Sequence, residues 1–517
     1  MKTEWFDSTL RDGSQAEGIS FSIRDKLNIV QALDEFGVDY IEAGNPASNP
    51  KEQRFFEELK ALTLRHSRLC AFGSTVRFGV KPEEDAGLAA LVAAGTEVVS
   101  IFGKAWDLHV TEILRITREQ NLAIIDGTIR YLKSLGRELI FDAEHFFDGY
   151  KADPAYATAV LRTAVDAGAD CLCLCDTNGG MLPLGIAEIV KTVCETFPGR
   201  RIGIHCHDDS GCAVANTVTA VMSGACHVQG TFIGYGERCG NANLSAIIPD
   251  LILKCGDAGG VSLETLKPTA RRIAEISNVH LPFSAPYVGK SAFSHKGGMH
   301  IDGVLKLPRS FEHIDPETVG NERKFLLSEV SGRGTVLPKI QKYAPEITKQ
   351  SPQTATITEK LKEQELHGYQ YEAAEASFEL FVKKALGLWQ SHFRVIMYKV
   401  TDDFPAPDGE QQSNAIVKIE VDGRTEMTCD TGNGPVNALD RALRKALTAF
   451  YPQLTEMHLI DYKVRVINSQ NTDAVTRVLI ESTDGEAPFT TVGVSSDIIE
   501  ASMTALTDSY EYVLSGK

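Results

Sequence analysis

Two histidines separated by one residue, His205 and His207, have a spacing that suggests chemistry. Side chains two positions apart on a β-strand point to the same side, so both imidazoles would face one space. Neutral imidazole is a common ligand of divalent metals, so the pair predicts half of a metal site; the alternative is a pair of hydrogen-bonding histidines. Asp12 would add a carboxylate and Asn241 a carbonyl oxygen, which leaves coordination positions open for a substrate. Such a mixed set of nitrogen and oxygen ligands is compatible with Mn, Mg or Zn.

Arg11 stands beside Asp12 in the stretch DSTLRDGSQ. Next to a metal-bound carboxylate, a guanidinium would neutralise the oxygen of a substrate carbonyl as negative charge develops there. The alternative is a surface ion pair between the two side chains, which would contribute little. Gln15 would position Arg11 or a ligand, or it is an ordinary turn residue.

Four further side chains are candidates for substrate or proton chemistry. Glu144 could take part in proton transfer near a metal, and Asp142 would share its face of the strand, so the choice between them stays open. Thr177 offers a hydroxyl beside the backbone amides of a predicted helix N-terminus, a suitable place for a substrate carboxylate; the alternative is a helix N-cap. His300 lies in the Gly-rich stretch HKGGMH and could complete the site as an acid or a base.

The elements that must position these residues alternate between β-rich runs and amphipathic runs. We predict strands at 4–10, 39–44, 68–73, 97–103, 138–144, 170–176, 202–208 and 227–234, with helices between them such as 25–37, 82–95, 155–168 and 183–197, and a last helix near 241–256. Alternation of this kind implies βαβ units with parallel strands, and eight units over about 255 residues are the size of a (β/α)8 TIM barrel. A doubly wound open sheet is the alternative, although no GxGxxG motif follows an early strand.

The polar residues named above fall at the carboxyl ends of the predicted strands. Arg11 and Asp12, Glu42, Glu144, the stretch 176–178, the stretch 205–207 and the loop 234–243 all take such positions. Active sites of TIM barrels are built from these strand ends. The repeated coincidence is the strongest argument from the residues alone that the protein is an enzyme.

The chain after the barrel has a different pattern. We predict a catalytic barrel at 1–260, a linker or lid region with helices at 261–388, and a C-terminal α+β domain at 389–517. The last region looks like a duplicated βββα unit, with strands at 393–401, 415–423 and 424–434 before a helix at 436–450, and strands at 459–467, 474–485 and 489–495 before a helix at 497–506. Because it lacks obvious catalytic groups, we interpret it as a regulatory, effector-binding or assembly domain.

The composition excludes some classes of protein. The net charge of −17 argues against a nucleic-acid binder, which needs clustered Lys and Arg. No apolar run is long enough to span a membrane, and the N-terminus lacks a signal-peptide core. The 11 cysteines, with no CxxC motif, are expected to be reduced thiols of a cytoplasmic protein, and those of CLCLC to be buried on one face of a strand.

The motifs together resemble a known family. DSTLRDGSQ, CDTNGG, HCHDDSG, GYGERCGNANL and SHKGGMHIDG are similar to motifs of the isopropylmalate, homocitrate and citramalate synthases, which belong to the DRE-TIM metallolyase superfamily. The resemblance covers nearly the whole chain, including a C-terminal domain like the LeuA-type regulatory domain. Within the family, AEGISFSIRDKLNIVQALDEFGVDYIEAGNP, FGKAWDLHVTE and FDAEHFFDGYKADP look most like the (R)-citramalate synthase branch.

The resemblance implies a reaction and a role for each candidate. The reaction would be a Claisen condensation of acetyl-CoA with pyruvate, followed by hydrolysis to citramalate and CoA, in isoleucine biosynthesis. Asp12, His205, His207 and Asn241 would hold the metal. Arg11 and Thr177 would bind the keto acid, and Glu144 would activate the acetyl-CoA methyl group with His300, which would come from the partner subunit of a homodimer. The C-terminal domain would bind the pathway end product, expected to be isoleucine.

Two departures and three alternatives stay open. The family usually has a Tyr at Phe311 and an Asn at Asp208, so a hydroxyl near His300 is missing and a carboxylate is added beside the metal ligands. A 2-isopropylmalate or homocitrate synthase would use a larger 2-oxo acid. A metal-dependent acyl-CoA lyase would need only the barrel, and a degenerate barrel could serve as an amino-acid-binding regulator.

Overall fold

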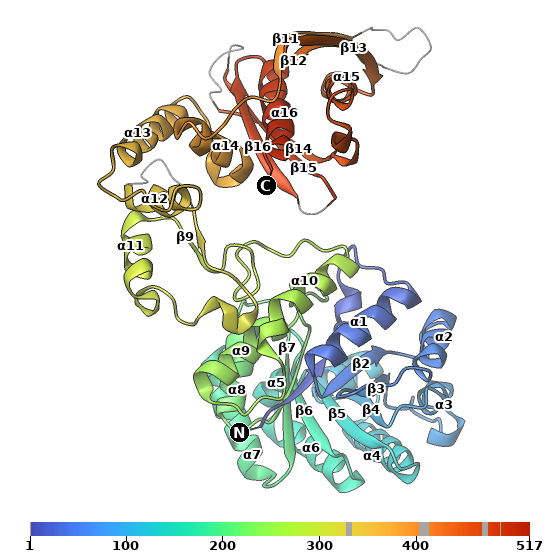
Figure 1. The fold of residues 1–517 in the computed structure, drawn as a ribbon. Helices are drawn as coiled ribbons and strands as arrows, with labels where there is room; N and C mark the ends of the chain where they lie inside the picture. The colour runs from blue at the N-terminus through green and yellow to red at the C-terminus, as the bar shows by residue number, and fades with distance from the viewer. Residues whose placement is uncertain (1, 327–332, 403–412, 468–473, 486–487, 517) are drawn as a thin grey trace. The chain divides into compact units, whose positions relative to one another are not determined.

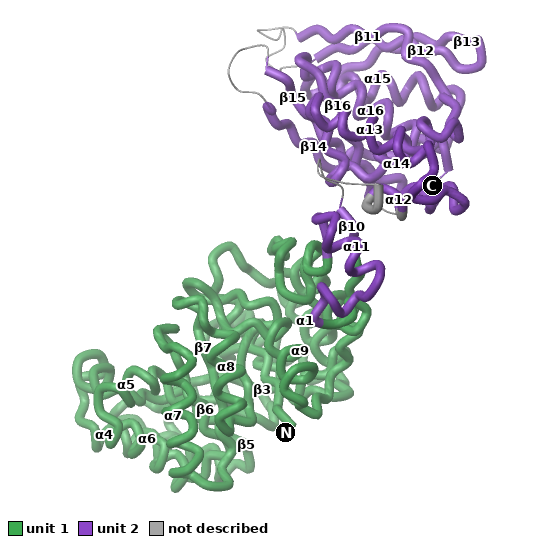
Figure 2. The backbone as a smooth tube through the Cα atoms, turned by 90° about the vertical axis from the view of Figure 1, so that its left-hand side faces the viewer, with its two compact units in different colours: residues 1–293, 314–323 green, residues 294–313, 324–517 purple. Residues whose placement is uncertain are grey.

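The computed structural model describes residues 2–326, 333–402, 413–467, 474–485 and 488–516. The chain forms two compact units, 1–293 with 314–323 and 294–313 with 324–517 (Figure 2). The expected division at residues 260 and 388 stays a prediction.

The first unit is built around a closed barrel of eight parallel strands (Figure 1). The strands are β1 (Glu4–Asp7), β2 (Tyr40–Gly44), β3 (Arg68–Ser74), β4 (Val98–Lys104), β5 (Glu138–Glu144), β6 (Cys171–Asp176), β7 (Arg201–Cys206) and β8 (His227–Gly230). β1 pairs with β8, Glu4 opposite His227, which closes the barrel. The predicted TIM barrel is therefore confirmed, and closure excludes the open doubly wound sheet.

Helices cover the outside of the barrel. They are α1 (Ile23–Phe36), α2 (Pro50–Leu59), α3 (Ala86–Ala93), α4 (Arg118–Ser134), α5 (Phe146–Ala152), α6 (Pro154–Ala167), α7 (Pro183–Thr196), α8 (Ala213–Met222), α9 (Leu244–Cys255) and α10 (Leu266–Ile276). Their ends follow local sequence signals. In α1, Ser22 and Asp25 form a capping box, and Gly37 ends the helix in the left-handed conformation, which a side chain would disfavour.

Alternate residues of the strands form two separate apolar cores. One lies between the strands and the helices and includes Trp5, Leu172 and Leu174. The other is the barrel interior, to which the strands contribute Phe6, Tyr40, Cys70, Val98, Ile140, Cys171, Cys173 and Cys175. The cysteines of CLCLC are therefore buried on one face, as predicted, because side chains on a strand alternate between its faces.

An ion-pair network closes the amino-terminal end of the barrel. Arg201 reaches Glu4 at 3.3 Å and Glu138 at 2.9 Å, and Arg68 also binds Glu138. The network joins residues of β1, β3, β5 and β7. It leaves the opposite end, where the carboxyl ends of the strands meet, for the candidate site.

The second unit contains helices, a two-stranded parallel sheet of β9 (Ser294–His295) and β10 (Lys324–Phe325), and two three-stranded sheets. Helices α11 (Gly298–Lys306), α12 (Arg333–Gln341), α13 (Pro352–Leu366) and α14 (Glu375–Ala385) precede a duplicated βββα arrangement. Its first copy is β11 (Arg394–Asp402), β12 (Ser413–Val421), β13 (Arg424–Gly432) and α15 (Pro435–Thr448); its second is β14 (His458–Val466), β15 (Thr476–Thr483), β16 (Phe489–Ser495) and α16 (Ile498–Leu514). Both three-stranded sheets are antiparallel, so the predicted α+β duplication is confirmed.

Two observations bear on the environment of the chain. All 11 cysteines are free thiols. Within the described residues, every helix is too short or too polar to cross a membrane.

Candidate metal centre and active site

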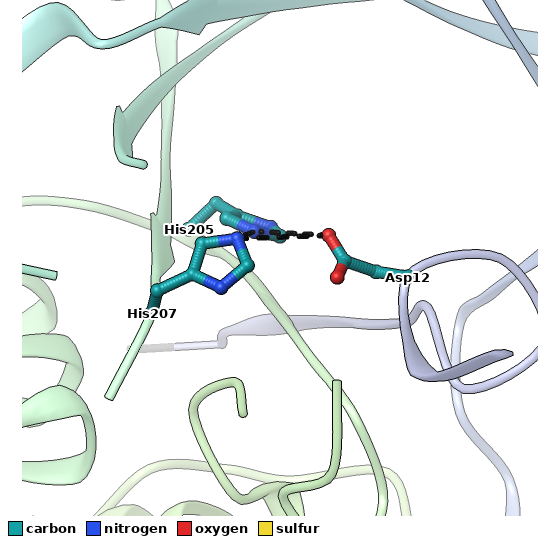
Figure 3. Close-up of side chains that lie close together, drawn as sticks. All are labelled: Asp12, His205 and His207. Atoms are coloured by element: carbon teal, nitrogen blue, oxygen red, sulfur yellow. Dashed lines mark hydrogen bonds and ion pairs between the residues drawn. The ribbon is translucent and has the colours of Figure 1, made fainter. Parts of the chain in front are cut away.

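Asp12, His205 and His207 meet at the carboxyl end of the barrel (Figure 3). Asp12 follows β1, His205 lies on β7, and His207 comes directly after β7. The Nε2 atoms of the two histidines are 3.5 Å apart and lie 3.6 Å and 3.8 Å from Oδ2 of Asp12. A point shared by three atoms at such separations lies about 2.1 Å from each, a usual bond length from nitrogen or oxygen to a metal such as zinc. The triangle therefore fits a divalent ion.

Asn241, the expected fourth ligand, lies beside this cluster. Its Nδ2 donates to Oδ1 of Asp12 over 3.0 Å, and its backbone forms an isolated bridge with His207. Its Oδ1 is buried and has no hydrogen-bond partner among the described residues. A buried carbonyl oxygen without a donor is costly unless something else binds it, and a metal ion would do so.

The charges around the cluster suit metal binding. Burial alone would raise the pKa of Asp12, but Arg11 and the two histidines hold it well below its usual range. Burial lowers the pKa of His205 to about 3, although Asp12 opposes the shift, and burial also lowers the pKa of His207. At neutral pH the carboxylate is therefore ionised and both imidazoles are neutral, which are the forms that bind metals.

Arg11 is held between two carboxylates. Its Nη1 lies 2.9 Å from Oδ2 of Asp12, and its Nε lies 2.6 Å from Oε2 of Glu42. The guanidinium also covers the ring of Phe72, with its carbon 3.9 Å from the ring centroid. The Arg11 side chain is only 12% exposed, so the ion pair with Asp12 exists but is not the surface ion pair considered above. A planar cation fixed on three sides is preorganised to meet developing negative charge.

Glu144 and Thr177 lie at neighbouring strand ends. Glu144 ends β5 and forms an ion pair with Lys104, the last residue of β4. Thr177 follows β6, and its Oγ1 accepts a hydrogen bond from the backbone N–H of His145 over 2.8 Å. The helix N-terminus predicted at Thr177 is wrong, because α7 begins only at Pro183, after a turn of two glycines.

Gln15 and His300 are the remaining sequence candidates. Gln15 is exposed and lines a cavity of about 310 Å³ together with Arg11, Phe72 and Lys26. His300 belongs to the second unit, where it lies on α11 with its ring centroid 4.4 Å from that of Phe311. The role of His300 at the barrel stays a prediction.

Asp208, one of the two departures from the family pattern, has a local role. Its Oδ1 accepts a hydrogen bond from the backbone N–H of Ala213, the first residue of α8, over 2.8 Å. The carboxylate therefore satisfies an orphan amide at a helix start, where its negative charge is favourable.

Three functional candidates were not assigned a role from the sequence. Glu42 holds Arg11, Lys104 holds Glu144, and Gln229 lies 3.1 Å from Nδ1 of His205. Each stands at or near a predicted strand end, which was the available signal. Their roles depend on neighbours from other strands, which one sequence does not reveal.

Comparison with known proteins identifies the family. Residues 2–269 match the HMGL-like family. A curated (R)-citramalate synthase from Aquifex aeolicus is 51% identical over 512 residues, 98% of this chain and 97% of that protein. One from Geobacter sulfurreducens is 49% identical over the same shares of the two chains. The chain belongs to the (R)-citramalate synthase family.

Two further family models match the part of this chain that follows the barrel. Residues 287–367 match a homocitrate synthase post-HMGL domain-like family, and residues 372–514 match the LeuA allosteric (dimerisation) domain. A probable 2-isopropylmalate synthase from Methanopyrus kandleri is more distant, at 30% identity over 97% of this chain and 96% of that protein. The resemblance seen in the motifs is thereby confirmed, as is the expected regulatory domain.

Proposed function

We propose that the protein is an acyltransferase that condenses acetyl-CoA with pyruvate and hydrolyses the product to (R)-citramalate and CoA, in the cytoplasm and in the route to isoleucine. Identity of 45–51% to curated (R)-citramalate synthases over nearly the whole chain is the observation that carries the proposal. Free thiols at every cysteine support a reducing compartment.

Asp12, His205, His207 and Asn241 would hold a divalent ion, Mn, Mg or Zn. When bound, the ion would act as a Lewis acid on the 2-oxo acid. The closed barrel brings Asp12, from the loop after β1, together with His205 on β7 and His207 just after it, and Asn241, from the loop after β8, is hydrogen-bonded to Asp12.

Arg11 would stabilise the oxygen of the pyruvate carbonyl. That oxygen gains negative charge as the acetyl methyl carbon bonds to the carbonyl carbon, and a fixed guanidinium costs no reorganisation at that moment. Glu42 on its far side keeps the cation in place. Thr177 would bind the pyruvate carboxylate, and Gln15 would contribute to the same pocket.

Glu144 would accept the proton from the acetyl methyl group, together with His300 of a partner subunit. Lys104 forms an ion pair with Glu144 and would hold its carboxylate in place, and a carboxylate is a group that can accept a proton. Water then cleaves the thioester, with the C–S bond breaking to release CoA. The match of residues 372–514 supports a homodimer with an amino-acid effector, which we propose to be isoleucine.

The experiment follows release of the CoA thiol from acetyl-CoA with pyruvate, 2-oxoisovalerate or 2-oxoglutarate, each with Mn²⁺ or Mg²⁺. Release with pyruvate that a chelator abolishes is the expected result. Release with a larger acid would instead indicate a 2-isopropylmalate or homocitrate synthase. Absence of release with all three acids would contradict the condensation and favour an acyl-CoA lyase or a regulator.

A further inference from the structure

A chain of four buried polar side chains runs inward from the metal centre. His205 on β7 places Nδ1 3.1 Å from Oε1 of Gln229 on β8. Nε2 of Gln229 donates to Oδ1 of Asp142 on β5 over 3.0 Å, and the hydroxyl of Ser100 on β4 donates to Oδ2 over 2.7 Å. All four residues are at most 5% exposed. This series of hydrogen bonds therefore links four strands through the buried interior of the barrel.

The chemistry of the donors fixes the direction of these bonds. Burial raises the pKa of Asp142 to about 7, and above that pH the group is a carboxylate that can only accept, receiving one hydrogen on each oxygen from Gln229 and Ser100. Gln229 must then turn its amide nitrogen to Asp142, which leaves its oxygen facing His205. Because an amide oxygen can only accept, Nδ1 of His205 must carry the hydrogen.

The consequence reaches the metal centre. When Nδ1 carries the hydrogen, the lone pair of the neutral imidazole is on Nε2, the atom that faces Asp12 and His207 (Figure 3). His207 has no such support, because its Nδ1 is buried without a hydrogen-bond partner among the described residues. The two histidines thus differ in a way that can be measured.

We propose that Gln229 is a positioning residue of the metal centre, which holds His205 in the tautomer that presents Nε2 to the ion, with Asp142 and Ser100 fixing the Gln229 amide. The proposal rests on the metal centre of the proposed function. Groups that orient a ligating histidine contribute about 10- to 100-fold to metal affinity in other metal sites.

The first test is the Mn²⁺ affinity of the full-length, chelator-treated protein, measured by calorimetry. Gln229→Met keeps the length and volume of the side chain without its polar atoms, and we expect it to weaken binding about 10- to 100-fold. Asp142→Leu should also weaken Mn²⁺ binding. Asp142→Asn keeps an acceptor for the Gln229 amide, so it should keep most of the affinity of the parent. Asn216→Ala is the control, because it removes another fully buried amide. Asn216 lies on α8, and its Nδ2 donates to the backbone carbonyl of Met181.

The second test needs no variant. Nitrogen NMR of histidine-labelled, metal-free protein, at a pH where Asp142 is ionised, should show His205 as a single Nδ1–H tautomer. An Nε2–H tautomer or a mixture at His205 would overturn the proposal, as would a folded Gln229→Met variant that binds Mn²⁺ within about twofold of the parent. A parent protein that binds no divalent ion would overturn the proposed function and this role together.

Discussion

At the scale of single residues, the candidate site depends on which atoms of ordinary side chains face one another. Nε2 of each histidine and Oδ2 of Asp12 form one triangle, and Arg11 is fixed beside it by Glu42. Each of these contacts can be removed alone. The first two predictions separate metal binding from charge stabilisation.

Replacing His205 by alanine should remove the metal without unfolding the barrel. We expect kcat/KM for CoA release to fall roughly 1,000-fold, because a Lewis-acid metal supplies several kcal/mol to such a reaction. Metal content per chain and CoA release would both be measured. His66→Ala is the control, at an exposed histidine just before the amino end of β3, the end of the barrel opposite the metal centre. A metal-replete His205→Ala variant would show that the ligand assignment is wrong.

Replacing Arg11 by lysine should lower kcat much more than metal affinity. A lysine carries the charge but cannot bridge Asp12 and Glu42 or lie flat on Phe72, so we expect a loss of roughly 100-fold or more in kcat. Steady-state kinetics and Mn²⁺ calorimetry would distinguish the two effects. Arg54→Lys on α2 is the matched control, since its side chain is 73% exposed and forms an ion pair with Glu58 of the same helix. Unchanged kcat in Arg11→Lys would remove Arg11 from the mechanism.

At the scale of elements, the end of β1 carries a buried carboxyl group that the reaction does not use. Burial raises the pKa of Asp7 to about 7, although hydrogen bonds from the backbone and hydroxyl of Thr9 oppose the shift. The carboxyl group is more easily protonated in the folded than in the unfolded chain. Its contribution to stability is therefore complete below the unfolded pKa and is lost as the pH rises through about 7.

Replacing Asp7 by asparagine should remove this dependence on pH. As the pH rises from about 4 to 7, the parent should lose stability that the Asp7→Asn variant does not lose. The free energy of unfolding of the variant minus that of the parent should therefore increase by as much as about 1.4 kcal/mol per pH unit. Urea unfolding of the metal-free proteins at several pH values would measure it. A constant difference between the two proteins over this range would contradict the raised pKa.

At the scale of the whole molecule, the metal should stabilise the barrel, because its ligands come from residues as distant in sequence as Asp12 and Asn241. An ion that binds only the folded protein stabilises it by about 2.7 kcal/mol at a concentration 100 times its Kd. We expect the barrel's melting temperature to rise with added Mn²⁺ and to fall with chelator. In the His205→Ala variant, the same addition should have little effect. Equal stabilisation of both proteins would point to binding elsewhere.

The regulatory unit belongs to the same scale. Its two βββα copies form separate three-stranded antiparallel sheets, with α15 packed on the first and α16 and α14 packed on the second. The match to the LeuA allosteric (dimerisation) domain agrees with the function expected from its lack of catalytic groups. The effector and the subunit arrangement remain proposals that binding and sedimentation measurements would test.

The sequence alone determined the barrel, the βββα duplication and the metal ligands that the structure brings together. These features depend on local periodicity: helices and strands follow the spacing of apolar residues, and the HxH spacing places both imidazoles on one face of a strand whatever surrounds it. Strand ends converge in any closed parallel barrel, so Asp12 and the histidines could be expected to meet.

Only the tertiary structure decided which side chains touch across strands. Glu42 beneath Arg11, Lys104 on Glu144 and Gln229 between His205 and Asp142 each join different strands, and the register of strand pairing controls their meeting. Thr177 shows the same limit, because its hydroxyl accepts from His145 on a neighbouring loop and not from the helix that follows it. Contacts of this kind depend on distances in space, and neither composition nor spacing along the chain contains them.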